Sequence, residues 1–393
     1  MRHIVIVGAG FAGMRLARKL SKQKNVKVSL INPSTQFRYT PALYRAASGL
    51  NGGTAWLPLE WMLLDAANVT FVLGSVAGID NSKKTIELHD SRIIEFDDIV
   101  FALGSVTTYF SITGLDEYSY GVKSADEIHE LKEHIHANLL HPDKASKDYV
   151  IIGAGPTGVE FSAVLGAHIK RISKRHHVSS AHLKIHLVEA GPRILPQLSN
   201  RASCKALKQL QNNNVIVHTS TQVKAETANT LKMSLGTMQT DNVIWTAGTM
   251  NNPFFAGHPD IFELDKRGKV VVDKHLQVSH NVYVCGDNAA TPFSGLALTA
   301  IKHADFIADD IKRRMKNKKR KVQCDHHPMQ VVPIGEKHAV FQYRAITLSG
   351  RLISIIRKVA DIIGYTDIMG ILRAFTIWRN SDSAKVACDI CGR

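Results

Sequence analysis

Two glycine-rich segments with identical spacing are the strongest candidates for a chemical role in this chain. The glycines concerned are Gly8, Gly10 and Gly13 in the first segment, and Gly153, Gly155 and Gly158 in the second. In a G-x-G-x-x-G segment the first glycine permits a tight turn. The second lets the backbone approach a pyrophosphate, and the third lets a helix pack closely on a strand. Both segments are therefore candidate dinucleotide-binding turns.

Each candidate turn stands between a predicted strand and a predicted helix. The apolar run His3–Val7 precedes the first turn, and Met14–Leu20 follows it with the pattern of an amphipathic helix. A helix N-terminus offers free N–H groups and partial positive charge to phosphates. Tyr149–Ile152 precedes the second turn in the same way. Two such units in one chain predict two dinucleotides that face each other, one a flavin and one a nicotinamide.

The strand after each turn ends on a polar residue. Val26–Ile31 leads to Asn32, and Lys184–Val188 leads to Glu189. Further buried strands end in small residues, at Ala102-Leu103-Gly104, Trp245-Thr246-Ala247-Gly248 and Cys285-Gly286-Asp287. The helix Leu296–Lys316 is expected after the last of these.

These elements predict an α/β fold with two Rossmann-like dinucleotide-binding domains. The flavin domain is expected to take residues 1–112 and 249–323. The nicotinamide domain is expected as an insertion over residues 113–248. Residues 324–393 are expected to form a C-terminal amphipathic module.

Composition limits the class of protein. The 393 residues are 45% hydrophobic and 21% charged, which fits a globular protein with a full core. No apolar run reaches the ~18 residues needed to span a bilayer, and the N-terminus does not resemble a signal peptide. We therefore expect the chain to fold in the cytoplasm.

The five cysteines do not form the pattern of a disulfide framework or a metal site. Cys388 and Cys391 form a lone C-x-x-C three residues from the end, whereas a zinc site would require a second pair. We expect a frayed tail there, although a redox role stays open. No metal site is predicted.

The net charge of +15 indicates attraction to polyanions. Lys312–Lys321 is a basic run, and Leu348–Trp378 alternates apolar and basic residues at helical spacing over two stretches, about 350–363 and 366–379. A basic amphipathic helix with a Trp is typical of a segment that lies in an anionic membrane surface. Burial of the same apolar faces in a homodimer is the alternative, and the two are compatible. No nucleic-acid recognition motif is present, so nucleic acid is not expected as a partner.

Taken together, these motifs resemble the two-dinucleotide-binding-domain flavoproteins, and within them the type II NADH dehydrogenases. Four stretches carry the resemblance: Gly8–Leu20, Gly153–Glu160, Val188–Pro196 and Pro333–Val340. The resemblance implies one FAD, an NADH, and a membrane quinone as acceptor. It also implies a peripheral protein on the cytoplasmic face of the cell membrane, commonly a homodimer.

The resemblance also implies roles for individual residues. The FAD would be held by Gly8, Gly10, Gly13, Asn32, Val76, Gly104, Gly286 and Asp287. The NADH would be held by Gly153, Gly155, Gly158, Glu189 and Gly248. Asn32 stands where the family usually has an acid for the ribose, and its amide can still bond a 2′-hydroxyl. The charge of Glu189 would repel a 2′-phosphate and favour NADH, with Arg193 leaving NADPH open. Glu160 would lie near the nicotinamide or only orient the turn.

The segment expected at the quinone site departs from the family pattern. The family carries A-Q-x-A-x-Q there, and this chain reads Ala297-Leu298-Thr299-Ala300-Ile301-Lys302. Leu298 would offer an apolar wall, and Lys302 would polarise a carbonyl of the acceptor or simply face solvent. Two alternatives therefore stay open. The chain could reduce a soluble acceptor such as oxygen or a small redox protein, or it could be a non-catalytic NADH sensor. Disulfide reduction is not expected, because no cysteine precedes Cys204.

Overall fold

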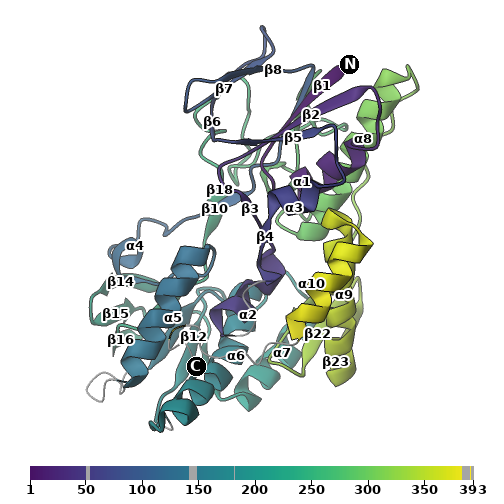
Figure 1. Cartoon of the computed structure of the whole chain (residues 1–393). Helices are drawn as coiled ribbons and strands as arrows, with labels where there is room; N and C mark the ends of the chain where they lie inside the picture. The colour runs from purple at the N-terminus through teal and green to yellow at the C-terminus, as the bar shows by residue number, and fades with distance from the viewer. Residues whose placement is uncertain (50–53, 141–147, 181, 383–389, 391–393) are drawn as a thin grey trace.

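A six-stranded sheet forms the centre of the first unit (Figure 1). The computed structural model describes residues 1–49, 54–140, 148–180, 182–382 and 390. The sheet has the order β19-β20-β9-β1-β2-β5, and all its strands are parallel except the edge strand β19. These strands are β1 (Arg2–Val7), β2 (Val26–Asn32), β5 (Val69–Leu73), β9 (Asp98–Phe101), β19 (Gln277–Ser279) and β20 (Val282–Val284).

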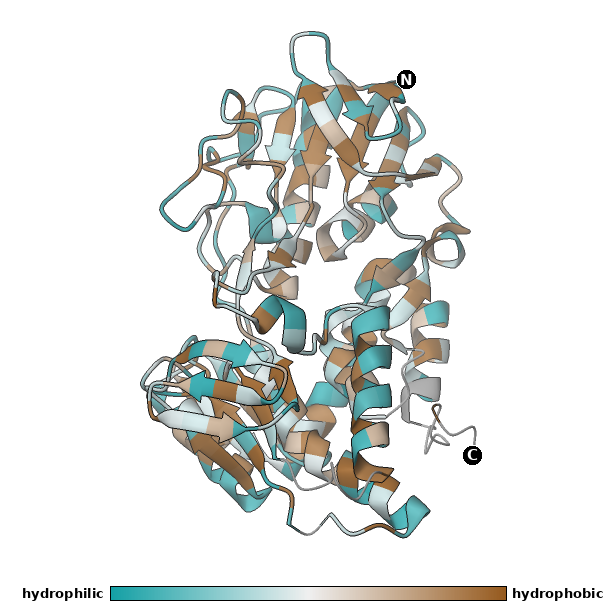
Figure 2. Ribbon diagram, turned by 90° about the vertical axis from the view of Figure 1, so that its left-hand side faces the viewer, coloured by the Kyte–Doolittle hydropathy of each residue, from teal (hydrophilic) through white to brown (hydrophobic). Residues whose placement is uncertain are grey.

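Two helices that are far apart in the sequence pack side by side on this sheet. They are α1 (Phe11–Leu20) and α8 (Ala297–Met315) (Figure 1). Figure 2 shows the strands of this sheet as largely hydrophobic, as expected for parallel strands covered on both faces. The smaller elements of the unit are β3 (Gln36–Arg38), β4 (Trp56–Pro58), β6 (Val76–Asp80), β7 (Thr85–Leu88), β8 (Ile93–Glu95), the 3-10 turns η1 (Thr40–Ala42) and η3 (Gly286–Asn288), α2 (Leu43–Ala47) and α3 (Leu59–Leu63).

The second unit repeats this plan on a smaller scale. Its parallel sheet has the order β13-β12-β11-β17. An antiparallel sheet, β14-β15-β16, lies beside it, and the two-stranded ribbon β10-β18 connects the units. The elements are β10 (Ser105–Thr107), α4 (Leu115–Tyr118), α5 (Ala125–Leu140), β11 (Tyr149–Ile152), α6 (Pro156–His176), β12 (Ile185–Val188), α7 (Asn200–Asn212), β13 (Val215–His218), β14 (Val223–Thr227), β15 (Thr230–Met233), β16 (Gly236–Gln239), β17 (Val243–Trp245) and β18 (Thr249–Asn251). The predicted α/β class is confirmed.

The C-terminal segment forms a three-stranded antiparallel sheet followed by a helical hairpin. The strands are β21 (Gln330–Pro333), β22 (Ala339–Tyr343) and β23 (Ile346–Gly350), and the helices are α9 (Arg351–Met369) and α10 (Ile371–Asp382). No helix in the described ranges is long and apolar enough to cross a membrane.

The expected break between the two C-terminal helices near residue 364 is wrong. Helix α9 continues through Gly364 and ends at Met369, and Gly370 makes the turn. A Cβ at Gly364 would lie 2.5 Å from the Tyr39 hydroxyl, so this glycine serves close packing and does not end the helix. Ile368, in the second expected amphipathic stretch, is fully buried. The Trp378 indole N–H donates to the Lys358 carbonyl at 3.0 Å.

Asp361 anchors helix α9 to the first unit. Its carboxylate, only 3% exposed, accepts hydrogen bonds from Arg45 of α2 at 2.9 Å, from the Tyr39 hydroxyl at 3.1 Å, and from Arg357 of α9. Burial opposes ionisation, but Arg357 and Arg45 hold the pKa of Asp361 below its ordinary value. The Tyr39 ring also stacks on Tyr365 with centroids 4.0 Å apart.

Because of this anchor, we expect substitutions of two carboxylates that hold the same module to differ strongly in their effect on the free energy of unfolding. Asp361→Asn would leave two buried guanidinium groups without a full counter-charge and should lower the free energy of unfolding by about 3 kcal/mol. Asp65 bonds Arg373 of α10 and Arg18 of α1, but its side chain is 52% exposed. Asp65→Asn should cost less than about 1 kcal/mol. Urea unfolding of both variants measures the difference, and equal losses would contradict the anchor.

Candidate functional site

In the first glycine turn, two of the three glycines have no room for a side chain, and the third faces open space. Gly8 has φ +103°, and a Cβ there would lie 2.3 Å from the Ala102 carbonyl oxygen. A Cβ at Gly13 would lie 1.8 Å from the Gly8 carbonyl oxygen, so any side chain would force α1 away from the turn. At Gly10, in contrast, no atom lies within 4 Å of the Cβ position. This open cradle before the N-terminus of α1 fits a pyrophosphate.

The second turn has the same geometry on the other parallel sheet. Gly153 has φ +100°, and its Cβ would lie 2.6 Å from the Ala247 side chain. A Cβ at Gly158 would lie 1.9 Å from the Gly153 carbonyl oxygen, whereas Gly155 again faces open space. The turn precedes helix α6. A second pyrophosphate therefore fits here by the same test.

Asn32 and Glu189 occupy equivalent places, each bonded to its own glycine turn. The Asn32 side-chain oxygen accepts the Ala9 N–H at 3.0 Å. The two Glu189 oxygens accept the N–H groups of Ala154 and Gly191, both at 2.8 Å. Each carboxylate oxygen keeps a second acceptor position. Glu189 can therefore hold the turn and accept ribose hydroxyls at the same time.

Arg193 is hydrogen-bonded to backbone carbonyls of its own loop. Its guanidinium donates to the carbonyls of Leu198 at 2.7 Å, Leu195 at 3.3 Å, and Pro196. These bonds occupy donors that a 2′-phosphate would need. The geometry therefore favours NADH over NADPH at this turn, in the same direction as the Glu189 charge.

The Gly286 turn brings α1 and α8 together at the end of β20. Gly286 has φ +67°, and a Cβ there would lie 3.5 Å from Ala300 of α8 and 3.9 Å from Ala12 of α1. The Gly286 N–H donates to Nδ1 of buried His303 at 3.2 Å. Burial lowers the pKa of His303 to about 4, so this imidazole is neutral at pH 7 and can accept that bond. Asp287 follows directly and accepts the Ser105 hydroxyl at 3.3 Å.

Asn288 is a positioning residue that the sequence analysis missed. Its fully buried side chain bonds the backbone of Gly104 twice, to the carbonyl at 2.8 Å and from the N–H at 2.9 Å. It also donates to the Asn251 side chain at 2.6 Å. Gly104, at φ +68° with open space at its Cβ position, is thereby fixed beside the Gly286 turn. The run Gly286-Asp287-Asn288 was the available signal, because an Asn after this turn can clamp a neighbouring strand end.

Lys123 is a second residue that the sequence analysis missed, at the ribbon between the two units. Its ammonium donates to the Gly248 carbonyl at 3.3 Å. Burial lowers the pKa of Lys123 to about 8. Gly248 has φ +71°, and its Cβ would lie 2.3 Å from the Thr108 carbonyl oxygen. No motif surrounds Lys123 in the sequence, so only the fold could reveal this contact.

The three residues predicted to act in the reaction lie on two helices, α6 and α8. Glu160 lies in α6 within electrostatic reach of Arg357 and Arg45, and burial raises its pKa to about 8, with both arginines opposing the shift. Leu298 and Lys302 lie in the first turns of α8, with Leu298 half-buried and Lys302 exposed.

Val76 lies two residues after Gly74, whose N–H donates to the Asn32 carbonyl at 3.0 Å. It is half-buried at the start of β6, where it pairs with Leu88.

The cysteines of the described ranges show no reactive pair. Cys285 is buried, its thiol lies 3.7 Å from the Phe101 carbonyl oxygen, and burial raises its pKa to about 12. Cys204 and Cys324 are exposed free thiols. Cys388 and Cys391 lie outside the described residues. Across the same described ranges, no group of three His, Cys, Asp or Glu side chains could hold a metal ion.

Relatives with curated names carry the predicted resemblance over nearly the whole chain. A type II NADH:quinone oxidoreductase of Mycobacterium tuberculosis is 28% identical, and the match covers 96% of this chain and 88% of the relative. A type II NADH:quinone oxidoreductase of Staphylococcus epidermidis is 26% identical over 95% of this chain and 98% of its own length. The resemblance to the type II enzymes predicted from the sequence is confirmed.

Solved structures share the fold. NDH2 from Plasmodium falciparum, solved in complex with NADH, superposes with a TM-score of 0.87 at 17% identity and covers 98% of this chain and 99% of its own. The sulfide:quinone oxidoreductase of Aquifex aeolicus gives a TM-score of 0.81 at 18% identity, covering 98% and 96%. The family model for pyridine nucleotide-disulphide oxidoreductases matches residues 2–305. The chain belongs to the pyridine nucleotide-disulphide oxidoreductase family.

Proposed function

We propose that this chain is a flavoenzyme that takes hydride from NADH and passes two electrons to a membrane quinone without pumping protons. The observation that carries the proposal is the pair of open glycine turns, one on each parallel sheet, in units joined by the β10-β18 ribbon. The curated relatives named as NADH:quinone oxidoreductases support the choice of donor and acceptor. FAD, when bound, accepts hydride from NADH and releases electrons to an acceptor.

The FAD is held by residues 1–112 and 249–323. Gly8, Gly10 and Gly13 receive the pyrophosphate at the N-terminus of α1, and Asn32 faces the ribose. Val76 contacts the adenine, Gly104 borders the flavin, and the Gly286-Asp287 turn holds the ribityl chain or pyrophosphate. Asn288 keeps Gly104 in place through its two backbone bonds.

The NADH is held by residues 113–248. Gly153, Gly155 and Gly158 receive its pyrophosphate at the N-terminus of α6, and Glu189 binds the adenosine ribose. Gly248 lets its strand end approach the Thr108 carbonyl beside the β10-β18 ribbon. Glu160 lies near the nicotinamide and, with a pKa of about 8, its carboxyl is largely protonated at pH 7.

The acceptor approaches the start of α8. The positive end of this helix stabilises negative charge on the flavin side of the site. Leu298 supplies an apolar wall and Lys302 a charge that can polarise a carbonyl. The exposed position of Lys302 and the absence of the family's two glutamines favour one second candidate, a reductase with a soluble acceptor.

The C-terminal module, residues 324–393, holds the protein on an anionic membrane surface at the cytoplasmic face of the cell membrane. The exposed large apolar side chains of its two helices are Leu352, Ile355, Ile356, Val359 and Ile363 on α9 and Ile371, Leu372 and Phe375 on α10. This set exceeds what a water-facing hairpin normally exposes. The same face is available for a homodimer contact.

Anaerobic stopped-flow absorbance tests the proposed reaction. NADH should bleach the flavin band rapidly, and a short-chain quinone should restore it rapidly. Bleaching without recovery would contradict the quinone as acceptor and support a soluble acceptor. Absence of bleaching by both NADH and NADPH would contradict an enzyme and support a sensor.

The charge of Glu189 should determine the preference of the enzyme for NADH over NADPH. Glu189→Gln removes the charge that repels a 2′-phosphate while keeping one acceptor for the glycine turn. The ratio of kcat/KM for NADPH to that for NADH should rise about tenfold, equivalent to ~1.4 kcal/mol. Glu87→Gln, at an exposed carboxylate on β7, is the matched control and should leave the ratio unchanged. An unchanged ratio in Glu189→Gln would remove this residue from cofactor selection.

A further inference from the structure

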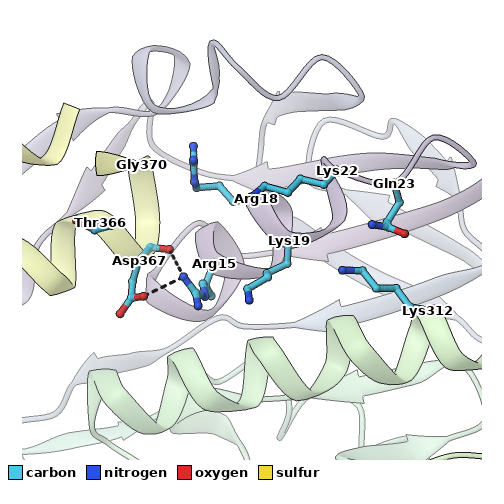
Figure 3. A pocket seen from close by; sticks show the side chains of 9 residues that line it. All are labelled: Arg15, Arg18, Lys19, Lys22, Gln23, Lys312, Thr366, Asp367 and Gly370. Carbon is cyan, nitrogen blue, oxygen red and sulfur yellow. Dashed lines mark hydrogen bonds and ion pairs between the residues drawn. The ribbon is translucent and has the colours of Figure 1, made fainter. Parts of the chain in front are cut away.

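A pocket of about 460 Å³ lies between α1, α8 and the end of α9, away from both glycine turns (Figure 3). Five cationic side chains and one carboxylate line it. The lining residues are Arg15, Arg18, Lys19, Lys22, Gln23, Lys312, Thr366, Asp367 and Gly370. These residues come from three elements far apart in the sequence, so the concentration of charge results from the fold.

Only part of this positive charge is neutralised by neighbouring carboxylates. Arg15 bonds Asp305 at 2.7 Å and Asp367 at 2.9 Å, and Lys19 lies 3.3 Å from Asp305. Arg18 bonds Asp65 at 3.0 Å. Within the described part of the chain, Lys22 and Lys312 have no carboxylate within 4.0 Å.

Figure 3 shows Lys19 and Lys312 between α1 and α8, with the Lys22 side chain extending toward Arg18. Burial lowers the pKa of Lys312, the charges of Lys19 and Lys22 lower it further, and the charge of Asp309 opposes the shift. The pocket therefore offers two lysines to an anion.

The pocket adjoins the exposed apolar face of the C-terminal hairpin. Gly370 lines the pocket, and a Cβ there would lie 3.0 Å from the Arg18 guanidinium. The next two residues, Ile371 and Leu372, are 69% and 83% exposed. A ligand that occupies the pocket therefore lies directly beside apolar surface. Inorganic phosphate would use the charge alone, whereas an amphipathic anion would use both features.

We propose that this pocket binds the phosphate headgroup of an anionic phospholipid whose acyl chains lie along α9 and α10. The inference rests on the proposed membrane role of the C-terminal module and deepens it, because it names a headgroup site of defined residues in place of a general attraction. Charge complementarity and the adjoining apolar face select the lipid over a second copy of this chain. A second copy would bring the same positive charge against the pocket.

Vesicle flotation tests the site with the full-length flavoprotein. Phosphatidylcholine vesicles with and without phosphatidylglycerol are compared for the wild type and the Lys22→Gln/Lys312→Gln double variant. The double variant should lose affinity for the anionic vesicles by roughly thirtyfold. Lys224→Gln/Lys266→Gln removes two exposed lysines outside the pocket and should bind like the wild type. Flavin content and thermal midpoint of all variants verify folding.

A soluble short-chain lipid distinguishes binding in the pocket from attraction to general surface charge. Dihexanoylphosphatidylglycerol should bind the wild type saturably in calorimetry, and Lys22→Gln/Lys312→Gln should abolish this binding. Inorganic phosphate that binds equally well would assign the pocket to free phosphate and overturn the lipid proposal. A double variant that instead changes the oligomeric state in light scattering would overturn it in favour of a chain–chain contact.

Leu372→Asp distinguishes failure of this inference from failure of the membrane role. One outcome is that the wild type binds anionic vesicles, Leu372→Asp loses this binding, and the lysine double variant keeps it. That outcome overturns only the pocket proposal. If the wild type fails to bind any vesicle, the membrane role itself is overturned.

Discussion

The close approach of α1 to the turn before it is the constraint on which the rest of the structure depends. No side chain fits at Gly13, because its Cβ position is 1.8 Å from the Gly8 carbonyl oxygen. This contact fixes the N-terminus of α1 over the open cradle at Gly10. It also fixes the helix against α8 and the Gly286 turn. Helix α1 therefore positions both the Gly10 side and the Gly286 side of the proposed flavin site. The opposite end of α1 carries basic residues of the proposed lipid pocket. One backbone contact thus orients a proposed cofactor site and a proposed membrane site on the same rigid helix.

Local sequence signals were sufficient for the parts of the fold that depend on backbone geometry. The glycine turns, the strands before them and helix α8 were predicted because their patterns are short and periodic. The Asp361 anchor could not be predicted, since its partners Tyr39 and Arg45 lie more than 300 residues away in the chain. The same long-range packing explains why Gly364 continues a helix and why Ile368 faces inward. Asn288 and Lys123 were missed because their roles require two strand ends to meet.

The proposed reaction divides its tasks between backbone and side chains. The glycine turns and Asn288 position the cofactors, Glu189 and the engaged Arg193 bias the choice of donor, and α8 supplies the charge-stabilising helix end. The hydride chemistry itself needs proximity more than acid–base groups. Replacement of the family's glutamines by Leu298 and Lys302 therefore changes how an acceptor is received and leaves the donor side intact. The Asp361 anchor holds the hairpin of α9 and α10 against the first unit, close to Glu160 of the second.

The most direct test of this account measures NADH oxidation with two quinones, a water-soluble short-chain one and a long-chain one dissolved in phosphatidylglycerol vesicles. The account predicts that wild-type protein reduces both, and that Leu372→Asp keeps short-chain turnover while losing long-chain turnover. Long-chain turnover that survives in Leu372→Asp would contradict the membrane-surface role. Failure of the wild type to reduce either quinone would contradict the proposed enzyme.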